Sequence, residues 1–256
     1  MKKNILLYIC VISLADISVA EENSLDITLD VGYFSQYLWY GIDLYADDHS
    51  ATQSSITASL YDTSFGFKIW NSLPNSNGLE NSKEFDYIVF YCNSLWNDSS
   101  FAVDYTINYI YMDIYDNPSK SLDTQEFGIA FSWPNLCPAI VPHYYIAKLW
   151  PTGSKVQKDV SGWIHCLGFS HEHKIPGILP EDKDLPLIFV CDLIYNDGYG
   201  LATADHDWSH VTMGLSAPIE FGKAILTPTI NYQISMDDSV NDEDELYYSL
   251  NFSYSF

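Results

Sequence analysis

The sequence contains no arginine and few basic residues of any kind. Eleven lysines stand against 34 Asp and Glu residues, which gives a formal net charge of −23 at neutral pH. Phosphate binding needs clustered Lys and Arg, so this balance argues against nucleic acid as a partner and against a basic patch that docks on anionic lipid. Long apolar runs are also missing beyond residue 20, which argues against a bundle of membrane-spanning helices.

The first 20 residues have the layout of a secretory signal peptide. Lys2 and Lys3 supply a positive start, and the apolar stretch from Ile5 to Leu14 is too short to span a bilayer. Ser18-Val19-Ala20 is a small-residue cleavage site. We therefore expect residues 1–20 to be removed on export and residues 21–256 to form the folded domain.

The remaining chain is rich in aromatic residues that alternate with polar ones. At the C-terminus one face of the expected strand is apolar and the other small and polar, with a period of two residues. The apolar face consists of Leu246, Tyr248, Leu250, Phe252, Tyr254 and Phe256. Similar alternation predicts clear strands at 25–33, 84–92, 101–111, 224–234 and 246–256. Weaker patterns predict further strands at 53–61, 64–70, 123–132, 139–149, 160–171, 185–195 and 207–217.

These strands have the length that a tilted strand needs to cross a bilayer, about 9–11 residues. Their connections alternate between long polar loops and mostly short turns, as in barrels of Gram-negative bacteria. The prediction is an all-β fold, an antiparallel transmembrane β-barrel of about 12 strands in the bacterial outer membrane. A secreted soluble β-sheet protein that binds carbohydrate through Tyr and Trp is the alternative.

The segment from Ser35 to Gly41, Ser-Gln-Tyr-Leu-Trp-Tyr-Gly, resembles the S-x-Y-V-W-R-G segment of a family of bacterial outer-membrane porins labelled TorF-like. The C-terminal strand that ends in Tyr254-Ser255-Phe256 is similar to the end of that family. The resemblance implies an outer-membrane barrel and a pore. Tyr40 stands where the family usually has Arg, so no role of that Arg is carried over.

The phase of the strands assigns polar residues to the inside of the barrel, because charges on the lipid face cost free energy. The candidates for the lumen are Asp26, Asp30, Lys68, Glu84, Asp86, Asp104, Asn108, Glu126, Asn231 and Glu245. Acids that line a pore attract cations, so we expect a small, cation-preferring pore for passive diffusion of hydrophilic solutes. A plugged structural barrel without transport is equally compatible with these residues.

Other chemistry receives little support from the sequence. No G-x-S-x-G motif or selected carboxylate pair indicates an enzyme, and no cofactor is expected. The His residues and acidic loops match no metal motif, so no metal site is predicted. Cys166 and Cys191 are a candidate disulfide across the turn that joins their strands, and unpaired thiols are the alternative.

The expected partners follow from a barrel in a membrane. They are outer-membrane lipid, the barrel-assembly machinery, and small hydrophilic solutes or cations. Tyr254 and Phe256 close an alternating aromatic strand beside the terminal carboxylate, so we expect them to act as the assembly signal.

Overall fold

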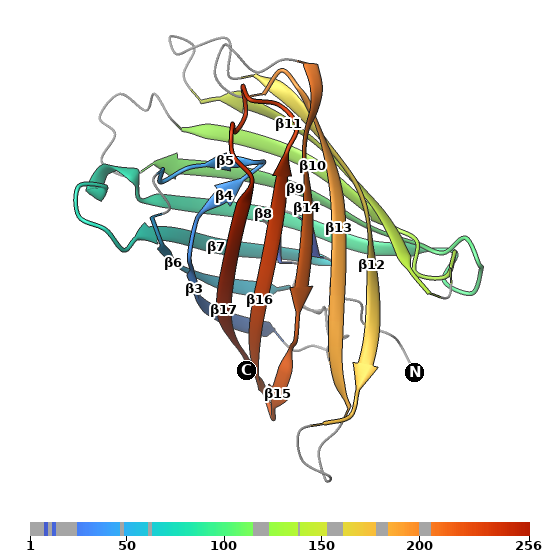
Figure 1. The fold of residues 1–256 in the computed structure, drawn as a ribbon. Coiled ribbons are helices and arrows are strands. Elements are labelled where there is room, and N and C mark those ends of the chain that lie inside the picture. The colour runs from blue at the N-terminus through green and yellow to red at the C-terminus, as the bar shows by residue number, and fades with distance from the viewer. Residues whose placement is uncertain are drawn as a thin grey trace.

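The computed structural model describes residues 8–9, 12–13, 25–46, 49–60, 63–114, 123–137, 139–152, 161–177, 184–199 and 206–256. Twelve long strands dominate it (Figure 1). They are β3 (Asp26–Phe34), β6 (Ala51–Ser59), β7 (Phe65–Pro74), β8 (Glu84–Leu95), β9 (Val103–Ile114), β10 (Thr124–Ser132), β11 (Val141–Pro151), β12 (Gly162–Ile175), β13 (Leu185–Asp197), β14 (His206–Ser216), β16 (Ala224–Ser235) and β17 (Glu245–Ser255). All twelve predicted strands are confirmed, with ends that differ by a few residues.

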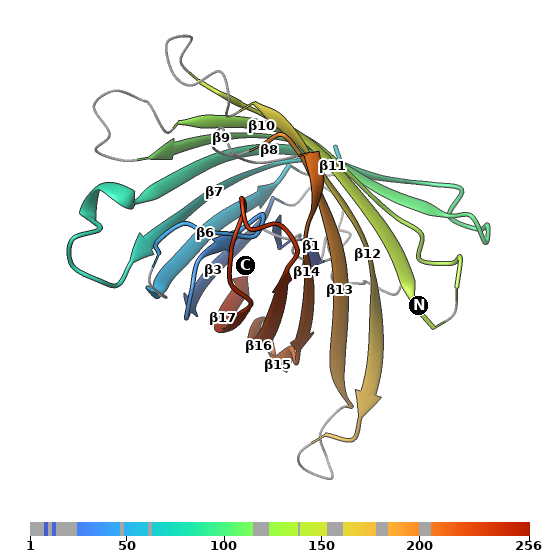
Figure 2. The same cartoon turned by 45° about the horizontal axis from the view of Figure 1, so that its top comes forward.

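The strands form one closed antiparallel ring. Long strands that follow one another along the chain are hydrogen-bonded neighbours, and β3 pairs with β17 to close the sheet. Figure 2 shows this ring obliquely from its upper end. Closure leaves no unpaired strand edge, which a sheet surrounded by hydrocarbon requires.

The short elements lie between or beside the long strands. They are β1 (Tyr8–Ile9), β2 (Ile12–Ser13), β4 (Leu38–Trp39), β5 (Ile42–Asp43), the single-turn helix η1 (Glu80–Ser82) and β15 (Ile219–Phe221). Among the described residues, no helix is long and apolar enough to span a membrane. Apart from β1 and β2, the predicted signal peptide lies outside the described residues and stays a prediction.

The outer surface of the barrel is apolar. Large hydrophobic side chains point outward at every second position, for example Ile230, which is 50% exposed, and Val89, which is 49% exposed. Others on this surface are Leu29, Val31, Tyr33, Ile56, Phe67, Ile69, Tyr87, Tyr109, Phe127, Leu167, Leu215, Tyr232, Leu246, Tyr248, Leu250 and Phe252. A soluble protein rarely exposes so extensive an apolar surface, so the alternative of a soluble carbohydrate-binding protein is wrong for this fold.

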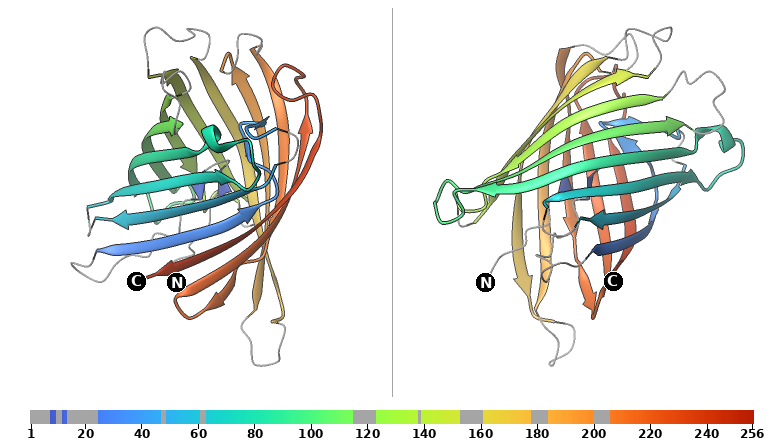
Figure 3. Two further views of the ribbon diagram at one scale, coloured as in Figure 1. Left: turned by 90° about the vertical axis from the view of Figure 1, so that its left-hand side faces the viewer. Right: turned by 180° about the vertical axis from the view of Figure 1, so that it is seen from behind.

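The inner surface is polar in parts and filled. Residues that alternate with the lipid-facing ones are buried, as Glu126, Asn108 and Gln233 show. Figure 3 shows the ring from two further sides. Because these wall residues are buried, another part of the chain must cover them inside the barrel.

Two adjacent residues in the middle of β16 test the assignment of the faces. Ile230→Lys places an ammonium group in lipid and should lower the free energy of unfolding by about 2–4 kcal/mol at mid-depth. Asn231→Lys places the same group in the acidic lumen and should cost much less. Urea unfolding in lipid vesicles measures both values. Equal losses, or a larger loss for Asn231→Lys, would contradict the assigned faces.

Candidate functional site

The first outer connection turns into the barrel instead of extending away from it. Within it, β4 and β5 form a small hairpin in which Leu38 faces Asp43 and Trp39 faces Ile42. Figure 1 shows β4 and β5 inside the ring of strands. We call residues 36–45 the lumenal hairpin.

A tight turn at Tyr40 and Gly41 makes the hairpin possible. Both residues have positive φ, 48° and 88°, as the two central residues of a type I′ turn require. Gly41 also lies against the ring of His210, where a Cβ atom would come within 2.5 Å of Nδ1. Tyr40 is not glycine and carries a backbone strain of about 1–2 kcal/mol, which its side-chain contacts must offset.

Two tyrosines of the hairpin donate hydrogen bonds to acids of the barrel wall. The Tyr37 hydroxyl donates to Glu84 Oε2 at 2.9 Å, and the Tyr40 hydroxyl donates to Glu126 Oε2 at 3.0 Å. Burial, and then the charge of the neighbouring acid, raise the pKa of Tyr37 and of Tyr40 well above the ordinary value. Both phenols therefore stay protonated and remain hydrogen-bond donors at any physiological pH.

Further hydrogen bonds hold the hairpin from other sides. Tyr45 donates to Ser72 Oγ at 2.8 Å, and Gln36 donates to Glu245 Oε2 at 2.8 Å. Gln233 donates to the carbonyl oxygen of Gly41 at 3.0 Å.

These bonds connect the hairpin to opposite walls. Glu126 lies on β10 and Glu245 on β17, which are six strands apart in the ring of twelve. The hairpin therefore crosses the lumen from one wall to the other.

Aromatic packing fills the space around the hairpin. The ring centroids of Trp39 and Tyr40 are 4.9 Å apart, and Tyr199 packs edge-on against Trp39 at 5.7 Å. These rings contact inward-facing apolar residues of the wall, which include Ile88, Ile110, Met112, Leu149, Ile164 and Ile194. Each buried large side chain contributes about 1.5–3 kcal/mol, so the hairpin has its own hydrophobic core inside the barrel.

Glu126 is the most heavily bonded acid of the lumen. It is 1% exposed and accepts hydrogen bonds from Tyr40, Tyr145 and the Asn108 amide. A buried carboxylate is tolerated when donors replace the water that it loses. Glu126 therefore gives the tip of the hairpin a defined binding place on the far wall.

The residues predicted to face the lumen occupy three kinds of place. Buried inside the barrel are Lys68, Glu84, Asp86, Asn108, Glu126 and Glu245. Half-buried are Asp26, Asp30 and Asn231, while Asp104 is exposed near the beginning of β9. The structure brings Asn108 to Glu126, and it places Lys68 within electrostatic range of Asp30 and Asp86. Asp26 and Asp104 join neither group.

The predicted disulfide is wrong. The cysteines that the structure describes form no disulfide, and the pairing register sets Cys166 opposite Ile194 and Cys191 opposite Phe169. The two thiols are therefore three positions apart, and an odd offset puts them on opposite faces of the sheet. In the structure β12 continues to Ile175, which pairs with Leu185, whereas the sequence analysis ended this strand at residue 171, so every pairing of the two strands is shifted.

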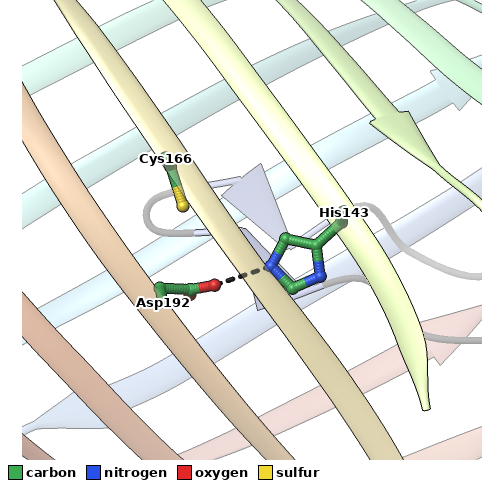
Figure 4. A group of neighbouring side chains, drawn as sticks. All are labelled: His143, Cys166 and Asp192. Carbon is green, nitrogen blue, oxygen red and sulfur yellow. Dashed lines mark hydrogen bonds and ion pairs between the residues drawn. The ribbon is translucent and has the colours of Figure 1, made fainter.

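Two features of the interior escape the sequence analysis. One is the hairpin, although inward-facing apolar residues such as Ile88 and Ile110 interrupt the polar faces of their strands and signal a partner inside. The other is a cluster of His143, Cys166 and Asp192 from three neighbouring strands (Figure 4). These residues are far apart in sequence, and only the strand register unites them.

Comparisons with solved structures show related barrels at low identity. The chain is similar to the NanC porin, with a TM-score of 0.52 and 12% identity over 90% of this chain and 99% of that one. It is also similar to the COG4313 outer membrane channel from Pseudomonas putida F1, with a TM-score of 0.55 and 9% identity over 96% of this chain and 100% of that one. The chain thus has the fold of bacterial outer-membrane β-barrels, which confirms the predicted fold class and agrees with the predicted location.

No family model and no curated protein matches the sequence. The resemblance to the TorF-like family therefore stays a prediction.

Substitutions at two glycines, one in the hairpin and one outside it, distinguish the cost of backbone strain from the cost of a steric clash. Gly41 and Gly78 have nearly the same positive φ, 88° and 93°, but nothing lies within 4 Å of a Cβ built on Gly78. Gly78→Ala should lower the free energy of unfolding by about 1–2 kcal/mol through strain alone. Gly41→Ala should lower it further, because the methyl group meets His210. Equal losses in equilibrium unfolding would show that the tip of the hairpin does not pack against β14.

Proposed function

We propose that the protein is a narrow outer-membrane pore for passive diffusion of small hydrophilic solutes, with a preference for cations. The observation that carries the proposal is the lumenal hairpin, which crosses an acid-lined barrel and narrows it to a constriction. The proposal needs no catalytic step, and the expectation that the chain is not an enzyme stays a prediction.

The charges of the lumen support the preference for cations. Four buried acids point inward, namely Glu84, Asp86, Glu126 and Asp192. Among the described residues, one lysine is buried with them, Lys68. Low-dielectric walls that carry charge of one sign focus the potential and enrich counter-ions. In a narrow path the wall lies within the Debye length, about 8 Å at physiological salt, so screening does not remove the effect.

Buried polar atoms of the inner wall support a hydrated path through the barrel. Four buried oxygen atoms have no hydrogen-bond partner within the protein: Asp86 Oδ1, Asn108 Oδ1, Thr212 Oγ1 and Ser216 Oγ. Such atoms normally bind ordered water. We infer that water occupies the lumen around the hairpin, and that small ions pass along it.

A plugged barrel without transport is the second candidate, and the burial of the lumen favours it. Gln233 and Glu126 are each only 1% exposed, whereas a wide pore would leave such residues open to solvent. Hydrogen bonds to opposite walls also hold the hairpin in place. The two candidates therefore differ in whether ions pass while the hairpin is bound.

Tyr254 and Phe256 belong to the proposed assembly of the barrel. Their rings are exposed on the outer surface and meet edge-on at 5.0 Å. We propose that the barrel-assembly machinery recognises this aromatic end before the strand pairs with β3.

Single-channel recording distinguishes the two candidates. Phe34 and Ala51 face each other across β3 and β6, so an Asn-Gly turn can replace residues 35–50 without separating the strands. The wild type should conduct weakly, and the variant without the hairpin should conduct several-fold more. In a salt gradient, the reversal potential of both should show a preference for cations.

Two controls accompany the recording. Changing the exposed residues Asn77, Glu80 and Asn81 to Ser should leave the conductance unchanged. Asp86→Asn in the lumen should reduce the preference for cations more than Asp98→Asn at the rim. A silent wild type with a conducting variant would establish the plugged barrel, and an anion-selective wild type would refute the proposed preference.

A further inference from the structure

We propose that His143, Cys166 and Asp192 form a binding site for a divalent transition-metal ion of the zinc class in the wall of the lumen. The site lies on β11, β12 and β13, and Cys166 also belongs to the buried cluster that surrounds the hairpin. It goes beyond the proposed pore and does not depend on it, because a plugged barrel would hold it equally well.

The strand register builds the site around a glycine. Gly168 on β12 faces His143 on one side and Asp192 on the other, and Cys166 points from the same face of β12 two residues away. A Cβ atom on Gly168 would come within 2.1 Å of Asp192 Oδ1 and 2.4 Å of His143 Nε2. The missing side chain therefore allows His143 and Asp192 to meet, and Figure 4 shows Cys166 beside them.

The distances are close to those of a metal site. One donor atom of each residue lies within 4.8 Å of the other two, and His143 Nε2 is 2.6 Å from Asp192 Oδ1. Tetrahedral zinc with bonds of about 2.0–2.3 Å holds its ligands about 3.3–3.8 Å apart. Side-chain rotations that move the donor atoms by about 1 Å would bring them to that spacing.

Burial makes a cation favourable at this position. His143 and Cys166 are each 1% exposed and Asp192 is 3% exposed. A thiolate, a carboxylate and a neutral imidazole together carry two negative charges, which a divalent ion balances. None of the lysines on the described strands does so. Lys68 lies on β7, four strands from β11, and Lys148 packs over Trp163 on the outer face. Lys174 is exposed towards the end of β12 and pairs with Glu172.

The second ring nitrogen of His143 is also buried inside the wall. His143 Nε2 bonds Asp192, but the buried Nδ1 has no hydrogen-bond partner. Buried polar atoms in native proteins are almost always paired, with protein, water or an ion. An ion bound through Nε2 would leave Nδ1 on the far side of the ring, where its N–H would bind an ordered water, as the second ring nitrogen of a metal-bound His does.

The donor set decides the class of ion. Nitrogen, sulfur and oxygen ligands suit zinc and its neighbours in the transition series, whereas calcium and magnesium prefer oxygen alone. Three protein ligands leave one coordination position open for water or for a solute in the lumen.

Metal binding to the purified chain in detergent micelles tests the proposal. After Zn²⁺ loading and dialysis, elemental analysis should find one equivalent per chain, and Co²⁺ should give a thiolate-to-metal charge-transfer band. Cys166→Ser and Asp192→Asn should each weaken binding by at least about 10–100-fold, the loss that even supporting residues of metal sites cause.

Cys191→Ser is the matched control, because this thiol adjoins Asp192 in sequence but points to the lipid face. It should bind Zn²⁺ like the wild type, with heat-modifiable migration on gels as the check that each variant folds. Thiol labelling of the wild type needs no variant, and Zn²⁺ should slow the labelling of Cys166 but not of Cys191. No bound metal in the folded wild type, or binding that survives Cys166→Ser and Asp192→Asn, would overturn the proposal.

Discussion

The hydrogen bond between Tyr40 and Glu126 is the interaction on which the interior of this barrel depends. A carboxylate that is 1% exposed needs donors, and a hairpin that enters a lumen needs acceptors for its hydroxyl and amide groups. The pairs of Tyr40 with Glu126, Tyr37 with Glu84 and Gln36 with Glu245 satisfy both needs together. The wall acids therefore hold the hairpin, and the hairpin replaces the water that would otherwise solvate them.

The same acids have a second consequence. Among the described residues, the acids buried inside the barrel outnumber the buried lysine, Lys68. In the pore that we propose, the acids that hold the hairpin are also the groups that select the ions. The metal site that we propose at His143, Cys166 and Asp192 extends this principle to a single position, where a metal ion takes the place of the hydroxyl donor.

Alternation within single strands was enough to predict the barrel. Period-two patterns such as the one from Leu246 to Phe256 identify both the strand and its lipid face, because a bilayer accepts only closed sheets with an apolar outside. What lies inside depends on contacts between distant segments, so the hairpin was not predicted. Its trace in the sequence is the presence of residues such as Ile88 and Ile110 on faces that are otherwise polar. The disulfide prediction was wrong and the His143 cluster was missed for one reason: register across β11, β12 and β13 is set by turns whose geometry the sequence does not reveal.

The central claim is that the hairpin is bound to the far wall, and a double-mutant cycle between Tyr40 and Glu126 tests it most directly. Equilibrium unfolding of the wild type, Tyr40→Phe, Glu126→Leu and the double variant gives the coupling free energy between the two side chains. A hydrogen bond from a buried phenol to a carboxylate predicts a coupling of about 1–3 kcal/mol. Additive losses, with no coupling, would contradict the account and place the tip of the hairpin away from β10.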